Sequence, residues 1–212
     1  MPVLDPELTG RCVRLEPLGE QHLAGLVAAS AGEPELFRMS KVPVGEAEVE
    51  RYIEAAGATR ATRTAAPFAV VRLSDEVVIG SSRLFDLAWW PWPEGHPRHG
   101  HGGPDTCEIG HTWLTRSAIR TGANTEMKRL MLTLVFETWQ VQSVCFHTDA
   151  RNDRSRRALS RIGARYEGIL RSHRLAADDQ PRDSARFAIT AADWPAVRVH
   201  LAELSRERLL AS

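Results

Sequence analysis

The sequence predicts an α/β protein in which one mixed β-sheet carries helices on both faces. Short segments with alternating or continuous apolar residues, typical of strands, are interspersed with longer segments whose apolar residues recur at helical spacing. The chain has 212 residues, of which 43% are hydrophobic and 25% charged, values typical of a folded globular protein. Neither an internal repeat nor a linker divides it. We therefore expect a single domain over residues 1–212.

Charge and hydropathy exclude several classes of protein. Lys plus Arg and Asp plus Glu both total 27, so the chain lacks the basic excess of a general nucleic-acid binder. No apolar segment is long enough to cross a bilayer, and the N-terminal segment lacks the apolar core of a secretory signal. The cysteines, Cys12, Cys107 and Cys145, are odd in number and far apart, as in a reducing compartment. We expect a cytoplasmic protein without nucleic-acid or membrane partners.

The first half of the chain alternates between strand and helix patterns. In order, the residues predict a strand at 11–17, helices at 21–30 and 46–59, and strands at 68–71, 77–85 and 107–114. Between the last two strands, residues 88–104 are too rich in Pro and Gly for regular structure and are expected to form a long inserted loop. Its tryptophans are Trp89, Trp90 and Trp92. They are expected either to cover a substrate cleft or to contact a second subunit of a homo-oligomer.

The second half contains the clearest helix pattern. From Asn124, the apolar residues that fall on one helical stripe are Met127, Leu130, Met131, Leu134 and Val135. The segments that follow are a strand at 143–148, a helix that Asn152 or Asp153 caps and Gly163 ends, strands near 166–175 and 185–190, and a last helix from Asp193. This order completes the predicted mixed sheet.

The junction between the strand at 107–114 and the following helix has features of an anion site. A helix start leaves backbone N–H groups without partners and carries the positive end of the helix dipole. Gly122 lets the backbone approach a ligand closely. The alternative interpretation is an ordinary capped helix with a glycine turn.

Five segments in this order resemble the GNAT superfamily of acyl-CoA acyltransferases, and more narrowly its RimJ/RimL-like branch, which includes ribosomal-protein N-terminal acetyltransferases. They are EIGHTWL, RTGANTE, TDARNDRS, RIGARYEGILR and RDSARFAITAADWP. The resemblance extends from RCVRLEPL to DWPAV. It implies a mostly antiparallel sheet that opens into a V near Trp113 and Phe146. It also implies transfer of an acetyl or other short acyl group from acyl-CoA to a primary amine by direct attack, without a metal.

The resemblance assigns residues to the donor. The backbone of Thr112, Trp113 and Leu114 is expected to hold the pantetheine arm, which Asn152 would anchor. The residues expected around the pyrophosphate are Arg120, Thr121, Gly122, Ala123, Asn124 and Thr125. The phosphate loop departs from the family pattern, because Ile119 and Asn124 occupy its outer positions.

The resemblance also assigns catalytic residues. Ser155 lies one helical turn after Asn152 and is expected to protonate the departing thiolate; the alternative is a helix cap followed by a small packing residue. Glu167 is expected to act as the general base, with Glu108 as its rival, and either can instead be an exposed strand carboxylate. No cysteine has an activating neighbour in sequence, which disfavours an acyl-enzyme.

Several alternatives stay open. The basic helix after Asn152 forms either a solvated face or a contact with the CoA 3′-phosphate. A succinyl donor would need nearby cations, for which the candidates are His147, Arg171, His173 and Arg174. The inserted loop and the strand after it are rich in potential metal ligands, but their spacing fits no metal motif: His96, His99, His101, Cys107 and His111. A binding protein that senses acyl-CoA without turnover is the alternative to an enzyme, and the acceptor amine is undetermined.

Overall fold

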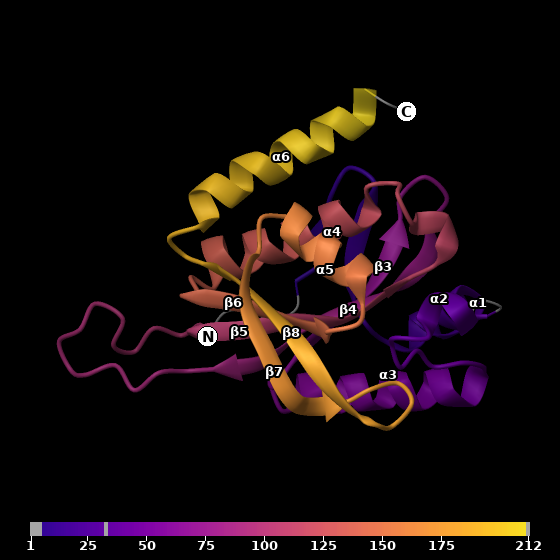
Figure 1. Cartoon of the computed structure of the whole chain (residues 1–212), viewed down its shortest axis with the longest axis horizontal. Helices are drawn as coiled ribbons and strands as arrows, with labels where there is room; N and C mark the ends of the chain where they lie inside the picture. Colours follow the sequence, from indigo (N-terminus) through magenta and orange to yellow (C-terminus); the bar gives the residue numbers. More distant parts are fainter. Residues whose placement is uncertain (1–5, 32–33, 211–212) are drawn as a thin grey trace.

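Figure 1 shows the computed structural model of the chain, which describes residues 6–31 and 34–210. Its strands are β1 (Leu8–Thr9), β2 (Val13–Pro17), β3 (Ala66–Arg72), β4 (Val77–Ala88), β5 (Thr106–Leu114), β6 (Ser143–Asp149), β7 (Arg165–Leu175) and β8 (Pro181–Thr190). Its α-helices are α1 (Leu23–Ser30), α2 (Pro34–Phe37), α3 (Glu46–Ala61), α4 (Ala123–Thr133), α5 (Asp153–Arg161) and α6 (Trp194–Leu210). A π-helical turn, Leu134–Thr138, continues α4.

The strands form one eight-stranded sheet in the order β1-β2-β3-β4-β5-β6-β8-β7. Only β5 and β6 are parallel, so the sheet is mixed and mostly antiparallel, as predicted. These two strands pair from Thr106 and Ser143 only as far as Glu108 and Cys145. Beyond Glu108 they diverge, and the later part of each strand has no partner on that side. The parting of β5 and β6 is the V that the sequence predicted.

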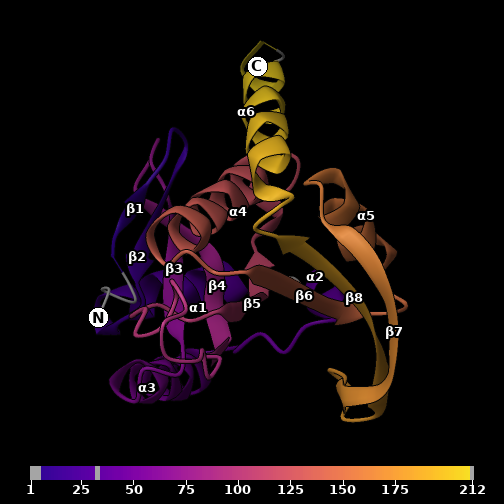
Figure 2. The ribbon, with the colours of Figure 1, turned by 90° about the vertical axis from the view of Figure 1, so that its left-hand side faces the viewer.

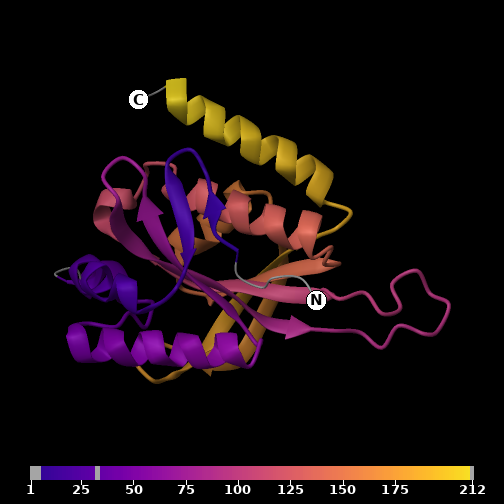
Figure 3. The ribbon, with the colours of Figure 1, turned by 180° about the vertical axis from the view of Figure 1, so that it is seen from behind.

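The helices cover both faces of the sheet (Figures 1 and 3). Helices α4, α5 and α6 pack on one face, and α1, α2 and α3 pack on the other face, over β3 to β5. The alternation of side chains along β3 accounts for a core on each face of the sheet. Phe68 and Val70 belong to the first core, on the side of α4 to α6, whereas Ala69, between them, belongs to the second core, on the side of α1 to α3. The apolar stripe of α4, which includes Met127 and Met131, lies in the first core as predicted.

The sequence analysis did not predict two short elements. Strand β1 has two residues and α2 has four, too few for a periodic pattern to appear. Helix α2 is nonetheless part of the second core, where the Phe37 ring meets the edge of Trp113 with the ring centroids 5.7 Å apart. It therefore packs directly against the diverging part of β5. No helix in the described residues is both long and apolar enough to span a bilayer.

The predicted loop between β4 and β5 projects from the molecule as an arm formed by residues 89–105 (Figures 1 and 3). One buried carboxylate, Asp105, organises it. Asp105 accepts hydrogen bonds from the Trp90 backbone N–H (2.7 Å), from Trp92 Nε1 (2.8 Å) and from the Arg98 guanidinium (3.0 Å). The Trp92 ring also stacks on His96, with centroids 4.2 Å apart. The arm thus has a small polar and aromatic core of its own.

Candidate functional site

A cavity of about 1520 Å³ occupies the opening between β5 and β6 (Figure 2 shows the two strands from the side). Its walls come from the diverging parts of both strands, the first turns of α4, helix α5, the segment after α2 and the β7–β8 hairpin. The predicted site residues that line it are Glu108, Thr112, Trp113, Leu114, Arg120, Gly122, Asn124, Thr125, Asn152 and Ser155. Thr121, Ala123 and Glu167 are not among its lining residues.

One end of the cavity is the N-terminus of α4. Gly122 is the N-cap and has a left-handed backbone with φ of 98°, and Arg120 before it has φ of 66°. The chain can make this turn because glycine adopts positive φ without steric cost. Thr121 turns inward, where its hydroxyl donates to the Ala118 carbonyl and accepts from the Ala123 N–H. Asn124 and Thr125, in the first turn of α4, line the cavity, and backbone N–H groups in the first turn of an α-helix have no intrahelical partner.

Arginines gather at this same end. Those that line the cavity are Arg116, Arg120, Arg154, Arg157 and Arg161. Arg151, which precedes α5, does not line the cavity and instead binds Asp149 at 2.8 Å. Positive side chains and a helix N-terminus together favour an anionic ligand.

The wall next to β5 combines unpaired backbone with an internal chain of polar side chains. Thr112 receives a hydrogen bond from Lys128 Nζ at 2.9 Å and lies 2.7 Å from the Ser82 hydroxyl. Lys128 comes from α4, is buried, and lies 5.6 Å from the centre of the Phe146 ring. Burial lowers the pKa of Lys128 to about 7, although the charge of Glu108 acts in the opposite direction.

Sequence reasoning missed Lys128. The signal was present, because Lys128 shares a helical stripe with Leu132 and Val135, both of which are buried. A charged residue in an apolar stripe indicates a buried charge or a polar cavity.

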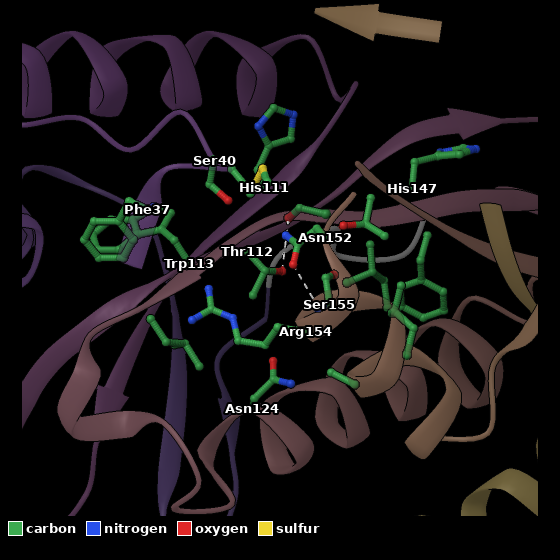
Figure 4. A pocket seen from close by; sticks show the side chains of 18 of the residues that line it. Phe37, Ser40, His111, Thr112, Trp113, Asn124, His147, Asn152, Arg154 and Ser155 are labelled. Atoms are coloured by element: carbon green, nitrogen blue, oxygen red, sulfur yellow. Dashed lines mark hydrogen bonds between the residues drawn. The ribbon is translucent and has the colours of Figure 1, made fainter. Parts of the chain in front are cut away.

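Asn152 and Ser155 lie on the α5 wall, next to Thr112 in Figure 4. The Asn152 side-chain oxygen accepts the Ser155 backbone N–H at 3.0 Å, so Asn152 is the helix cap of α5. Capping uses only the carbonyl oxygen of the Asn152 amide. Both side chains line the cavity, so capping and ligand binding are compatible at this position.

Glu35, Asp86 and Glu108 all line the cavity, and Glu108 is the buried one, only 1% exposed. It lies 2.8 Å from His147 Nδ1 and accepts two hydrogen bonds from Arg174, at 2.8 and 3.2 Å. Arg174 also binds Asp86 at 2.8 Å. Burial alone would raise the pKa of Glu108, but the hydrogen bonds and charges of His147 and Arg174 outweigh burial and lower it. Glu108 is therefore ionised at neutral pH.

Glu167 lies elsewhere. It is the extra residue of a β-bulge in β7, where the register with β8 shifts between Tyr166 and Gly168. Its side chain is exposed and pairs with Arg186 at 2.7 Å. The structure thus brings Ser155 and Glu108 to one cavity and leaves Glu167 outside it.

The histidines of the arm do not gather around one point. His96 stacks on Trp92, whereas His101 Nε2 is 2.7 Å from the Trp139 carbonyl oxygen. In the part of the chain that the structure describes, three potential metal ligands, Glu108, Cys145 and His147, have ligand atoms within 4.8 Å of one another. Glu108 already accepts two hydrogen bonds from Arg174, so a cation at this point would compete with a guanidinium.

The comparisons with known proteins agree with this geometry. Residues 13–165 match a family model described as "Acetyltransferase (GNAT) domain". A putative acetyltransferase structure from T. thermophilus is 30% identical, with a TM-score of 0.76 over 96% of this chain and 98% of that one. A GCN5-related N-acetyltransferase from Brucella melitensis is 28% identical, with a TM-score of 0.80 over 95% of this chain and 86% of that one.

More distant structures share the fold. The Mycobacterium smegmatis protein RimJ, solved in complex with CoA-disulfide, is 20% identical, with a TM-score of 0.76 over 95% of this chain and 94% of that one. No curated protein matched the sequence significantly.

Proposed function

Because the chain belongs to the GNAT acetyltransferase family and is an acyl-CoA-dependent N-acyltransferase, we propose that it acetylates a primary amine by direct attack on acetyl-CoA bound in the cavity. One observation carries the proposal: a single cavity combines a cationic helix N-terminus, an unpaired strand edge, a serine and an ionised carboxylate. Each of these features suits one part of the donor or one step of the reaction.

The donor follows the length of the cavity in this proposal. Its pyrophosphate binds the α4 N-terminus around Gly122, where first-turn residues and arginines line the cavity. Its pantetheine arm lies along Thr112, Trp113 and Leu114, where β5 has no partner on the β6 side. Asn152 contacts the arm from the opposite wall. The thioester then lies near Ser155, between the two walls of the V.

The chemistry is the direct transfer of an acyl group. A neutral amine attacks the thioester carbonyl, and backbone N–H groups of β5 polarise that carbonyl. The carbon–sulfur bond then breaks, and the Ser155 hydroxyl gives its proton to the thiolate. The amine must lose a proton. Glu108, inside the cavity, suits that part of the reaction better than the exposed Glu167.

The charges near the cavity favour acetyl over succinyl as the acyl group. Arg174, the best-placed cation of the succinyl alternative, already binds Asp86 and Glu108. Arg171 and His173 are not among the residues that line the cavity. A succinyl carboxylate at Arg174 would therefore have to compete with two protein carboxylates for that guanidinium.

The decisive experiment mixes the protein with acetyl-CoA and a panel of amines. The panel contains a peptide with a free N-terminus, an N-terminally blocked lysine peptide and a polyamine. We expect release of free CoA thiol that depends on one of these amines, and an acetylated product by mass spectrometry. Acetyl-CoA binding by calorimetry without thiol release for any amine would instead support the alternative of a sensor. Succinyl-CoA in a parallel series tests the other donor.

The proposal also includes a homo-oligomer in the cytoplasm. Trp89 and Trp90 on the projecting arm are 48% and 45% exposed, and two neighbouring indoles suit contact with a second copy of the chain. Cys12, Cys107 and Cys145 are free thiols, which suits a reducing compartment.

A further inference from the structure

Glu108 and His147 form a hydrogen-bonded pair across the point where the sheet opens. Glu108 is the last residue of β5 that pairs with β6, and its partner there is Cys145. His147 follows two residues later on β6, just beyond the last pair. Its side chain is 5% exposed and lines the cavity. The bond between Glu108 and His147 therefore spans the two arms of the V at their junction.

The hydrogen bonds of Glu108 determine the tautomer of His147. Because Glu108 is an ionised carboxylate that accepts from Arg174, it can only accept the bond from His147 as well. The hydrogen of a neutral His147 imidazole must then be on Nδ1, which lies 2.8 Å from the carboxylate oxygen. Nε2 is left with its lone pair.

Nε2 of His147 is buried and has no hydrogen-bond partner among residues 6–31 and 34–210. A buried polar atom without a partner costs on the order of 1–3 kcal/mol and needs an explanation. Six side-chain atoms of the described residues are in this condition, and His147 Nε2 is the one that belongs to a histidine lining the cavity. A structural role of His147 does not explain the unpartnered Nε2, since the bond to Glu108 already fixes the ring. A lone pair that stays free to accept a proton does explain it.

The groups around the ring come from every neighbouring element. They are Glu108 on β5, Asp86 on β4 beyond Arg174, Arg174 and His173 on β7, Arg186 on β8, and Cys145 on the same strand. The His173 ring is 4.6 Å from the His147 ring, centre to centre. Arg174 and Arg186 thus place positive charge near this ring, and Glu108 places negative charge against it. Arg182 on β8 and the buried Lys128 on α4 line the same cavity.

We propose that Nε2 of His147, directly or through one water molecule, takes the proton of the acceptor amine, and that Glu108 acts as a positioning residue through His147. This inference rests on the N-acetyltransfer proposed above. The ammonium form of the acceptor gives one proton to Nε2, which yields a neutral amine and an imidazolium. The amine attacks the thioester, the carbon–sulfur bond breaks, and the thiolate accepts a proton from Ser155. The second proton of the amine, lost as the amide forms, returns to the Ser155 oxygen, so that the serine ends the cycle as a hydroxyl. The imidazolium then releases its proton to water.

The first experiment needs no turnover. Nitrogen-15 NMR of histidine-labelled protein distinguishes the protonated and unprotonated ring nitrogens of His147, assigned by comparison with His147→Gln. We expect Nδ1 protonated and Nε2 unprotonated at about pH 8, and a mixture of tautomers in Glu108→Gln. Protonation on Nε2 in the native protein would overturn the inference.

The second experiment is chemical rescue with the amine that the thiol-release assay identifies. His147→Ala should lower kcat/KM for the amine by about 100-fold, the lower range for general base catalysis, and millimolar imidazole should restore about tenfold. The rescue should grow with the unprotonated fraction of imidazole. His173→Ala, a change in the adjacent ring, should stay within about threefold of the native rate and show no rescue.

The outcomes separate the two proposals. A native enzyme that transfers acetyl groups, with an unaffected His147→Ala variant, would overturn the role of His147 alone. No transfer by the native protein to any amine would overturn the proposed function, while the tautomer could still be measured. One equivalent of bound zinc, with activity lost on chelation, would assign His147, Glu108 and Cys145 to a metal instead and overturn the inference.

Discussion

Two buried carboxylates, Glu108 and Glu126, illustrate how similar residues acquire different roles. Glu126, on α4, accepts the backbone N–H groups of Arg11, Cys12 and Val13 at 2.8, 2.6 and 3.1 Å. It fastens α4 to the N-terminal strands through bonds to fixed backbone groups, and it also lies 3.7 Å from the Arg129 guanidinium. Glu108 accepts hydrogen bonds from side chains only, and one of these, His147, has a second ring nitrogen without a hydrogen-bond partner. The identity of the partners, rather than burial, separates a structural carboxylate from a functional one.

Sequence reasoning could identify Glu108 and Glu167 as candidates but could not choose between them. Both lie in strand patterns, and alternation alone allows either to point inward. The bulge at Glu167 places this side chain outside the cavity, because one extra residue re-aims it, and no periodic pattern reveals such a residue. The sequence likewise indicated His147 only as a candidate cation for a succinyl donor. Its function depends on a contact with Glu108 on another strand.

Ser155→Ala tests the proposed acid. The Ser155 side chain lines the cavity one turn after Asn152, so removal of the hydroxyl should cut turnover by about 100-fold. Donor affinity should barely change, because the lost interaction matters mainly in the transition state. Steady-state rates at saturating acetyl-CoA and calorimetry of donor binding measure the two quantities separately. Ser160→Ala, an exposed position on the same helix, is the matched control. Near-normal turnover of Ser155→Ala would remove the acid role.

Lys128→Met tests the cost of the buried lysine. The pKa of Lys128 is about 7 in the folded protein against an ordinary value of 10.5, so the unfolded chain binds more protons between these two pH values. The penalty is complete below pH 7 and fades as pH rises toward 10.5. We expect Lys128→Met to raise the free energy of unfolding by a few kcal/mol near pH 6 and much less near pH 10.

Thermal unfolding across pH checks this prediction. Thr112 keeps Ser82 as a partner in the variant, so it should not be left unpaired. A difference in Tm that does not depend on pH would show that Lys128 is not the source of the linkage. Arg129→Met, a partly exposed cation at the next position, should show no such dependence on pH.

Helices and strands were predictable where they are long and contribute to a core. The stripe of α4 and the apolar residues of β3 each repeat a signal over several residues, and Gly163, with φ of 90°, marks the end of α5. Strand β1 and helix α2 are held by contacts with distant parts of the chain, and their few residues contain no pattern. Helix α2 matters for the site, because the segment after it lines the cavity. The sequence analysis therefore missed this wall of the cavity.

The start of α4 gives a prediction for donor binding. Gly122→Val introduces a β-branched side chain where the backbone has φ of 98°, so it should both crowd the anion site and strain the turn. We expect acetyl-CoA affinity to fall at least tenfold, which corresponds to about 1.4 kcal/mol. Strain alone should lower stability by about 1–2 kcal/mol.

Gly45→Val separates the two effects. Gly45 is the N-cap of α3, has φ of 80° and has no atom within 4 Å of the position a Cβ would take. This variant should lose similar stability yet bind acetyl-CoA normally. Calorimetry that finds the same donor affinity for both variants would remove Gly122 from the anion site.

At the scale of the whole molecule, cations line the cavity on both sides of the V. Arginines from the side of α4 and α5 line one end, whereas Arg174 on β7 and Arg182 on β8 line the cavity together with Glu108, Asp86 and His147. On that second side carboxylates balance the cations, because Arg174 binds both Asp86 and Glu108. A net charge of zero for the whole chain does not reveal this difference between the two sides.

The arm has no part in the walls of this cavity, and its tryptophans give a prediction about assembly. The Trp92 side chain is used inside the arm by Asp105 and His96, but Trp89 and Trp90 are about half exposed. Two exposed indoles on a projecting segment are unfavourable in water unless another surface covers them. The Trp90 ring packs against Trp92 with the centroids 5.5 Å apart, but the hydrogen bonds to Asp105 involve neither the Trp89 nor the Trp90 indole. Changing both side chains should therefore leave the arm folded.

We expect Trp89→Ser with Trp90→Ser to lower the molar mass measured by light scattering to that of one chain. The Trp90 backbone N–H still donates to Asp105 in this variant, so the loss of mass would report the indoles rather than a collapsed arm. Val199→Ser, at an exposed apolar position of α6, is the matched control and should keep the native mass. A native protein that is already a single chain, or a double variant with unchanged mass, would show that the arm does not join subunits. In either case the tryptophans would have to be covered by a different partner, and pull-down with the arm variant as a negative control would be the next measurement.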